Sequence, residues 1–278
     1  MAIFLSLLTA AIFGTGDFCG GLAAKRASVV QVVAGSHLVG LVGVTIAAVL
    51  VADELIFEDV ALGAAGGAFG GIGVALLYRG LARGPMSVVA PLTAMTSAAI
   101  PAGWGLATGD SLTVAAAIGV GLALVAIGLV SSNSDGTATP VTFQVVGEAL
   151  VAGVGFGAFF ILLDATSSAS APWPIVGARL FTSTLLVLFL VAGRRRVFPR
   201  ATDARRLIVA TGVFDTGSNV LFLYATNQGS LTLVAVLSSL YPISTVLLAR
   251  YFLHEKMSRS QLWGFGAAVA ATALIAAG

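Results

Sequence analysis

The chain has 278 residues, of which 58% are hydrophobic and only 9% carry a charge, and its formal net charge is +2. A water-soluble domain carries charges on roughly a quarter of its residues, so this composition excludes an ordinary soluble protein. The single cysteine, Cys19, excludes a disulfide framework and a thiolate metal cluster. Because backbone groups in lipid need partners within the chain, long apolar stretches predict membrane-spanning helices and not barrel strands.

Ten apolar segments follow one another along the chain, each close to the roughly 20 residues that a transmembrane helix needs. The first begins at Ala2 without a basic leader or a cleavage-site pattern, so we interpret it as a retained helix. The sequence therefore predicts an all-α integral membrane protein with ten transmembrane helices. The predicted helices cover Ala2–Gly21, Val30–Val51, Val60–Leu81, Met86–Ala107, Leu112–Val130, Val141–Leu163, Trp173–Ala192, Leu207–Ala225, Leu231–Leu253 and Leu262–Ala277.

Basic residues gather at the connections on one side of the predicted bundle. Thirteen of the fourteen lie there: Lys25, Arg26, Arg79, Arg83, Arg194, Arg195, Arg196, Arg200, Arg205, Arg206, Arg250, Lys256 and Arg259. The connection over 52–59 is instead acidic, with Asp53, Glu54, Glu58 and Asp59. Because cytoplasmic loops carry an excess of Lys and Arg, the basic side is predicted to be cytoplasmic and both termini external.

The two halves of the chain resemble each other at a constant offset. A shift of 145 residues places 84–90 over 229–235 and Asp110 over Glu255 without a gap. With five predicted helices in each half, the second half crosses the membrane upside down, as in the inverted repeats of many secondary transporters. We therefore predict two five-helix repeats, over residues 1–131 and 141–278, joined by a polar linker over 132–140.

Several short motifs carry a resemblance to a known family. They are Phe13-Gly14, the stretch from Gly229 to Pro242, His254-Glu255-Lys256 and Gly264-Phe265-Gly266. In this order and spacing the chain resembles the EamA family of the drug/metabolite transporter superfamily. Phe13 stands where Trp is usual and His37 where Arg is usual, whereas Arg179 keeps the corresponding Arg of the second half. The resemblance implies export of a metabolite or toxic compound, and cytoplasmic termini, which conflicts with the orientation that the charges predict.

Six ionisable side chains fall inside the predicted helices, where a charge is costly and needs a reason. They are Asp17, His37, Glu148, Asp164, Arg179 and Asp215. Asp215 lies near the middle of 207–225 and four residues before Asn219, so both project from one helical face. A carboxylate beside an amide suits a cationic or hydrogen-bonding substrate, or a coupling proton. The alternative is a carboxylate that neighbouring hydroxyl and backbone groups satisfy for packing specificity.

The other ionisable residues suggest one acid–base pair in each half. Asp17 and His37 lie one to two turns from the predicted cytoplasmic side, and Arg179 and Asp164 lie similarly near the outer side. Such pairs either open and close as gates of a central cavity or tie neighbouring helices together as structural ion pairs. For His37, satisfied packing stands beside proton transfer. Glu148 is expected either in such an ion pair or facing the lipid headgroups.

Prolines interrupt the predicted helices over 86–107, at Pro91 and Pro101, and over 231–253, at Pro242. Breaks in repeat-related helices point to a substrate site. The polar residues expected to line it are Ser238, Ser239, Tyr241, Thr93 and Thr96. A spacing of four residues between Gly63, Gly67 and Gly71 predicts close helix packing.

Transport driven by a gradient is the function that these features favour. There is no Walker-type loop, and His37 and His254 do not share a metal-ligand spacing, so we predict no cofactor and no metal. The expected partners are a small-molecule substrate and the lipid bilayer of the cytoplasmic membrane, with a proton as a candidate coupling ion and no nucleic acid. The chain is expected to be a monomer or homodimer. The alternatives are uptake of a metabolite, a membrane-embedded enzyme using Asp17 and His37, and a receptor or other non-transporting membrane subunit.

Overall fold

The computed structural model describes residues 1–84, 86–131, 142–253 and 258–277. These residues form eleven α-helices and one short 3-10 helix, and they contain no strand. The elements are α1 (Ala2–Ala24), α2 (Val29–Val51), α3 (Phe57–Arg83), α4 (Met86–Thr108), α5 (Val114–Ser131), α6 (Phe143–Asp164), η1 (Ser168–Ser170), α7 (Trp173–Ala192), α8 (Thr202–Thr226), α9 (Leu231–Ser238), α10 (Pro242–Leu253) and α11 (Arg259–Ala277). The all-helical prediction is confirmed, whereas the predicted linker over 132–140 and the turn at His254, Glu255 and Lys256 lie outside the described residues.

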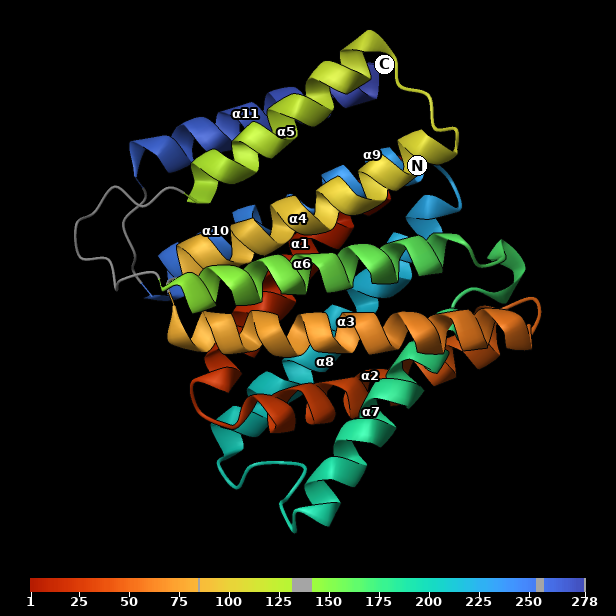
Figure 1. Ribbon diagram of the computed structural model, residues 1–278, viewed down its shortest axis with the longest axis vertical. Helices are drawn as coiled ribbons and strands as arrows, with labels where there is room; N and C mark the ends of the chain where they lie inside the picture. Colours follow the sequence, from red (N-terminus) through yellow and green to blue (C-terminus); the bar gives the residue numbers. More distant parts are fainter. Residues whose placement is uncertain (85, 132–141, 254–257, 278) are drawn as a thin grey trace.

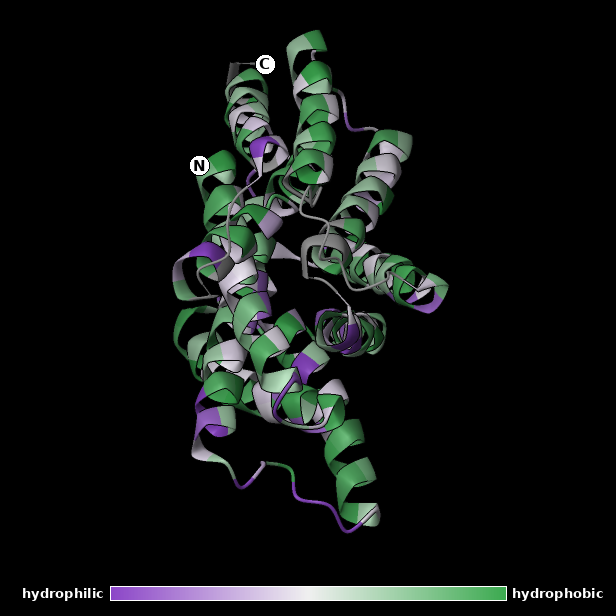
Figure 2. Ribbon diagram, turned by 90° about the vertical axis from the view of Figure 1, so that its left-hand side faces the viewer, coloured by the Kyte–Doolittle hydropathy of each residue, from purple (hydrophilic) through white to green (hydrophobic). Residues whose placement is uncertain are grey.

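Seven helical stretches within the described residues are long and apolar enough to span a membrane. They are α1, α2, α3, α6, α7, α8 and the stretch Leu231–Phe252, which contains α9 and most of α10. Figure 2 shows that hydrophobic residues cover much of these helices. On α2, for example, Ile46 and Leu50 are 57% and 75% exposed, which suits a surface that faces lipid tails. The predicted spans over 86–107, 112–130 and 262–277 fall on α4, α5 and α11 and stay predictions as membrane spans.

Side-chain caps explain where several helices begin. Ser28, Thr142 and Ser230 stand just before α2, α6 and α9, and each side chain accepts a hydrogen bond from the backbone N–H three residues later. A hydroxyl at this position satisfies one of the free donors of the first turn. Within the apolar stretches, these residues therefore mark the helix starts.

The prolines behave differently in the two helices that they were predicted to interrupt. At Pro242 the prediction is confirmed, because α9 ends at Ser238 and α10 begins at Pro242, where a missing N–H costs little. At Pro91 and Pro101 it is wrong, because α4 continues from Met86 to Thr108. Helices α6 and α9 pack against α4, and a packed helix tolerates proline as a local kink.

Helices from the first half of the chain pack mainly against helices from the second half. Helix α1 lies against α8, α9 and α10, α3 lies against α6 and α7, and α2 lies between α7 and α8. Helix α4 packs on α6 and α9, and α5 pairs with α11. Figure 1 shows the α5–α11 pair set above the rest of the bundle. The interface between the two halves therefore runs through the middle of the protein.

Glycines allow α3 to approach α7 closely, as their spacing predicts. A Cβ atom added at Gly63 would overlap the carbonyl oxygen of Pro174, and one at Gly67 would collide with Ala178. A Cβ atom at Gly177 would in turn overlap the carbonyl oxygen of Val60. Small residues on both helices therefore bring the two backbones into contact.

The connections separate into two ends. In Figure 1 the α1–α2 connection and the end of α3, which carry basic residues, lie at the left, whereas the acidic α2–α3 connection and the α6–α7 connection lie at the right. The N-terminus and the end of α11 also lie toward the right. The basic and acidic ends of the bundle are therefore distinct, and which of them faces the cytoplasm stays a prediction from the charges.

Candidate functional site

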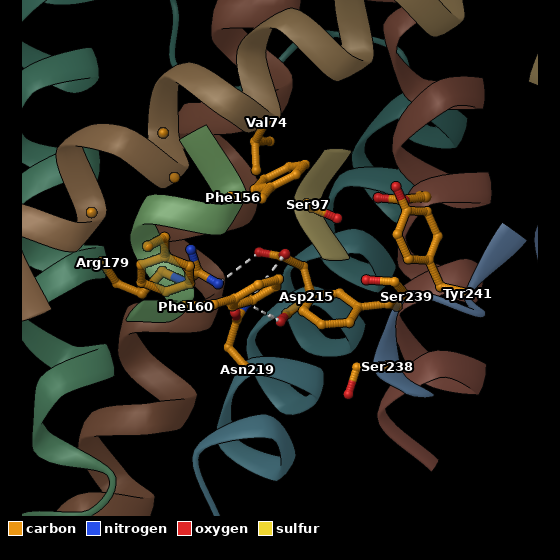
Figure 3. A pocket seen from close by; sticks show the side chains of 16 residues that line it. Val74, Ser97, Phe156, Phe160, Arg179, Asp215, Asn219, Ser238, Ser239 and Tyr241 are labelled. Carbon is orange, nitrogen blue, oxygen red and sulfur yellow. Dashed lines mark hydrogen bonds and ion pairs between the residues drawn. The ribbon is translucent and has the colours of Figure 1, made fainter. Parts of the chain in front are cut away.

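A cavity lies between the two halves. Its first-half walls come from α1, α3 and α4, and its second-half walls come from α6, α7, α8 and the break between α9 and α10. The polar residues that line it are Asp17, Ser97, Arg179, Asp215, Asn219, Ser238, Ser239 and Tyr241. The rest of the lining is apolar: Phe13, Val74, Phe156, Phe159, Phe160 and the α3 glycines Gly67, Gly70 and Gly71. Figure 3 shows Asp215 and Arg179 facing each other, with Ser238, Ser239 and Tyr241 on the other side.

An ion pair between Arg179 on α7 and Asp215 on α8 forms the centre of the site. Arg179 Nη2 donates to Asp215 Oδ2 at 2.8 Å, and the two residues are only 4% and 8% exposed. Arg179 Nε also donates to the hydroxyl of Thr216 at 3.0 Å. Removing two charges from water is costly, so such a pair persists only where further hydrogen bonds satisfy it. Here the guanidinium of Arg179 on α7 donates hydrogen bonds to two neighbouring residues of α8 and so links the two helices.

His37 on α2 completes this cluster as a neutral group. Arg179 Nη1 lies 3.2 Å from His37 Nε2, and because a guanidinium can only donate, Nε2 must accept. The ring proton therefore sits on Nδ1, which has no hydrogen-bond partner among the described residues. Although His37 Nε2 is 3.8 Å from Asp215 Oδ2, an unprotonated nitrogen makes no ion pair with a carboxylate. The positive charge next to Asp215 is that of Arg179.

The acid–base pairs differ from those that the sequence predicts. Arg179 does not pair with Asp164, which is exposed at the end of α6, and His37 bonds to Arg179 instead of Asp17. The reason is the packing, because α7 lies against α2 and against α8, so Arg179 meets residues of both. Asp17 lines the cavity, next to Gly16, which packs on the backbone of Asp215. One cluster between the halves replaces the two expected pairs.

Asn219 and Asp215 lie on one face of α8, as their spacing predicts, and both line the cavity. Asn219 Nδ2 donates to the backbone oxygen of Asp215 at 2.7 Å and lies 3.4 Å from its Oδ1. Two acceptors thus fix the orientation of the amide. The amide oxygen, Oδ1, has no partner among the described residues.

The break between α9 and α10 brings three predicted residues to the cavity. Ser238, Ser239 and Tyr241 all line it, and the Tyr241 hydroxyl donates to the backbone oxygen of Ala90 on α4 at 3.0 Å. The buried hydroxyl of Ser238 has no hydrogen-bond partner in the described part of the chain. The break therefore presents polar side chains to the cavity.

The expectation for Thr93 and Thr96 is wrong, because neither of them lines the cavity. The Thr93 hydroxyl donates to the backbone oxygen of Ala149 on α6 at 3.1 Å, and the Thr96 hydroxyl donates to Leu92 within α4 at 2.9 Å. Ser97, the next residue on α4, lines the cavity instead.

Glu148 forms an ion pair between α6 and α3. It is 8% exposed, and its Oε1 lies 3.0 Å from Arg79 Nε and 3.5 Å from Arg83 Nη1. The Arg79 Nε–H does not point at the carboxylate, so the contact is an ion pair without a directed hydrogen bond. Of the two positions that the sequence left open for Glu148, the structure favours the ion pair.

Sequence reasoning missed the aromatic wall of the cavity. Phe13 on α1 lies 6.1 Å from Phe160 on α6 and 6.3 Å from Tyr241, measured between ring centroids. Phe160 also lies 5.8 Å from Phe159. The signal available in the sequence was the pairing of aromatic residues with glycines in both α1 and α6, because glycine lets a neighbouring helix approach and leaves the rings to fill the space between.

Comparison with known proteins matches the second half to a family. The EamA-like transporter family model matches residues 146–277. Across these residues the chain is similar to the EamA-like transporter family. The crystal structure of another protein, 17% identical in sequence, matches with a TM-score of 0.76 over 98% of this chain and 95% of that chain. At this identity the match shows the fold alone. None of the curated proteins matches the chain.

The family match in the second half and the seven long apolar helices together indicate a membrane protein that is similar to the EamA-like transporters. Members of this family are typically transporters and not enzymes. The cavity between the halves is therefore considered as a transport site.

Proposed function

We propose that this protein is a secondary active transporter that exports a small metabolite or drug-like compound across the cytoplasmic membrane by alternating access. The observation that carries the proposal is the cavity between the two halves, which holds Asp17 and the Arg179–Asp215 pair at its wall. Ionisable groups deep inside a helical membrane protein mark substrate or ion pathways by default. Helices of both halves build this cavity, so a relative movement of the halves would change access to it.

We further propose ten membrane spans in two inverted repeats, over 1–131 and 141–278, with 132–140 as the linker. The repeats would pair α1 to α5 with α6, α7, α8, the α9–α10 unit and α11, in that order. Under this correspondence each strong contact between the halves has a counterpart: α1–α8 matches α3–α6, α2–α8 matches α3–α7, and the contacts of α1 with α9 and α10 match α4–α6. The contacts α2–α7, α4–α9 and α5–α11 are their own counterparts. Such two-fold pairing supports inverted repeats.

Contacts at both ends of the bundle have to open in turn during this cycle. At the acidic end, Asp110 Oδ2, just after α4, accepts from the backbone N–H of Thr232 at 3.0 Å and from its hydroxyl at 2.7 Å. At the basic end, Glu148 holds Arg79 and Arg83 of α3. Each contact joins one half to the other, so the two sets act as the candidate gates on either side of the cavity.

A proton is the coupling ion that the central cluster suits. Protonation of Asp215 would remove the charge that holds Arg179 and would leave the guanidinium bonded to His37 and Thr216 alone. A change in charge at a buried pair alters the packing of the two helices that carry it. In this protein those helices are α7 and α8, and both line the cavity.

The test begins with the substrate. Metabolite profiles of cells and medium, with and without the protein, identify a compound whose external level rises with expression. Asp215→Asn is then expected to abolish its gradient-driven flux in proteoliposomes while the protein still expresses and inserts. Asp164→Asn, at the exposed end of α6, is the matched control and should transport normally. Normal flux in Asp215→Asn would remove Asp215 from the coupling or binding role, and a compound that accumulates inside the cell would favour an uptake permease.

A further inference from the structure

Among the described residues that line the cavity, acidic side chains outnumber basic ones, with Asp17 and Asp215 against Arg179. In the described part of the chain Arg179 is the only basic residue of the lining, and its guanidinium is bound to Asp215 at 2.8 Å, to Thr216 and to His37. Asp17, the other acidic residue in the lining, has neither a hydrogen bond nor an ion pair with any described residue. It is partly buried and lines the cavity. A carboxylate enclosed in this way has to be neutralised by a bound cation or by a proton.

Two further polar atoms in the same cavity lack hydrogen-bond partners among the residues that the structure describes. Asn219 Oδ1 is an amide oxygen and can only accept, and the Ser238 hydroxyl, which can donate or accept, is the second atom. Asn219 is 3% exposed and Ser238 is 1% exposed, so neither reaches bulk water. Buried polar groups in native proteins normally have a partner. The carboxylate of Asp17, the amide oxygen of Asn219 and the hydroxyl oxygen of Ser238 can each accept a hydrogen bond from a bound molecule.

Another part of the cavity wall is aromatic. The rings of Tyr241, Phe13, Phe160 and Phe159 follow one another at centroid distances of 6.3, 6.1 and 5.8 Å, and all line the cavity. Ring faces attract cations within about 6 Å and also accommodate an apolar or aromatic body. The wall therefore suits a molecule with a cationic head and a hydrophobic remainder.

We propose that the cavity binds organic primary or secondary amines as ammonium ions, with the Asp17 carboxylate as the charge partner. The proposal rests on the transporter function proposed above and names its substrate class. The ammonium N–H groups would bond to Asp17, Asn219 Oδ1 and Ser238, and the apolar part would lie against the phenylalanine rings. The fully substituted nitrogen of a quaternary ion has no N–H for these acceptors. A ligand with a carboxylate would be repelled by Asp17. Arg179, the cation in the lining, is already paired with Asp215.

Binding to purified protein in detergent, followed by calorimetry, tests the proposal independently of flux. The probe is 2-phenylethylamine, compared with 2-phenylethanol, which replaces the ammonium with a neutral hydroxyl, and with 3-phenylpropionate. The amine is expected to bind at least about tenfold more tightly than either. Asp17→Asn should weaken amine binding at least about tenfold and leave alcohol binding unchanged. Asp164→Asn, which changes an exposed carboxylate outside the cavity, should bind the amine like the unchanged protein.

Ser238→Ala provides a second variant in case Asp17→Asn does not fold. It removes a hydroxyl without a partner, so folding should be preserved while amine binding weakens several-fold. Equal binding of amine and alcohol by the unchanged protein, or full amine affinity in both variants, would overturn the proposal. Amine binding without amine flux would contradict the transporter function and leave the ligand class standing. Gradient-driven flux of a different, non-basic metabolite without amine binding would contradict the proposed ligand class and leave the transporter function standing.

Discussion

The guanidinium of Arg179 on α7 and the carboxylate of Asp215 on α8 meet at 2.8 Å in the interior of the protein, and the same guanidinium reaches His37 on α2. One side chain thus connects a helix of the first half with two helices of the second half. All three helices meet at the interface between the halves. A single ion pair at this point can influence both stability and the movement of the halves.

The ion pair predicts an asymmetry between its two partners. Arg179→Gln leaves a buried carboxylate without a cation and is expected to lower the free energy of unfolding by about 3–5 kcal/mol. Asp215→Asn is milder, because the guanidinium keeps His37 and Thr216 as acceptors. Adding Asp215→Asn to Arg179→Gln should therefore restore about 2 kcal/mol or more of the lost free energy of unfolding. Unfolding in mixed micelles by titration with sodium dodecyl sulfate measures all three variants. If the double variant is less stable than Arg179→Gln, the pair is not the source of the effect.

The contact between Arg179 and His37 predicts the tautomer of the ring. Because Nε2 accepts from the guanidinium, His37 should be neutral with its proton on Nδ1 at pH 7. Nitrogen-15 NMR of histidine-labelled protein distinguishes this tautomer from the opposite one and from imidazolium. The chain has only one other histidine, His254, so His254→Gln assigns the two signals. A doubly protonated His37 ring would contradict the hydrogen-bond assignment and would make His37 a cation of the site.

Close packing of α3 on α7 gives a prediction with a matched control. Gly63→Ala would drive a methyl group into the carbonyl oxygen of Pro174, so it should lower the free energy of unfolding by about 1–3 kcal/mol. Gly43→Ala on α2 meets no atom within 4 Å and should be neutral or slightly stabilising, since alanine favours helices. The same titration in micelles compares the two variants. Equal stabilities would mean that the two backbones can separate at no cost.

Much of the fold follows from the sequence because the apolar stretches and their caps are local features. The segment predicted over Trp173–Ala192 is α7 itself, and the predicted break at Pro242 separates α9 from α10. The spacing of Asp215 and Asn219 likewise places them on one face of α8. Periodicity places a residue on a face and leaves open which helix that face meets.

The partners in the site depend on packing between distant segments, and there the prediction was wrong. Arg179 was assigned to Asp164 by depth in the membrane, whereas the contacts of α7 with α2 and α8 bring it to His37 and Asp215. The continuity of α4 through Pro101 has the same origin, because neighbouring helices hold it in place. The aromatic wall was missed because the pairing of phenylalanines with glycines in α1 and α6 does not by itself separate a cavity from a lipid face.

The separation of basic and acidic ends predicts the orientation of the chain in the membrane. Leu55→Cys lies in the acidic α2–α3 connection and Ala201→Cys in the Arg-rich α7–α8 connection, and both positions are exposed. Neither change alters a charge, so the bias that sets the orientation is preserved. In a chain with Cys19→Ser, a membrane-impermeant maleimide added to intact cells should label Leu55→Cys and spare Ala201→Cys. After the membrane is permeabilised, both should react, which shows that the second thiol is accessible. Labelling of Ala201→Cys alone in intact cells would place the basic end outside and the termini in the cytoplasm, and would reverse the direction assigned to each gate.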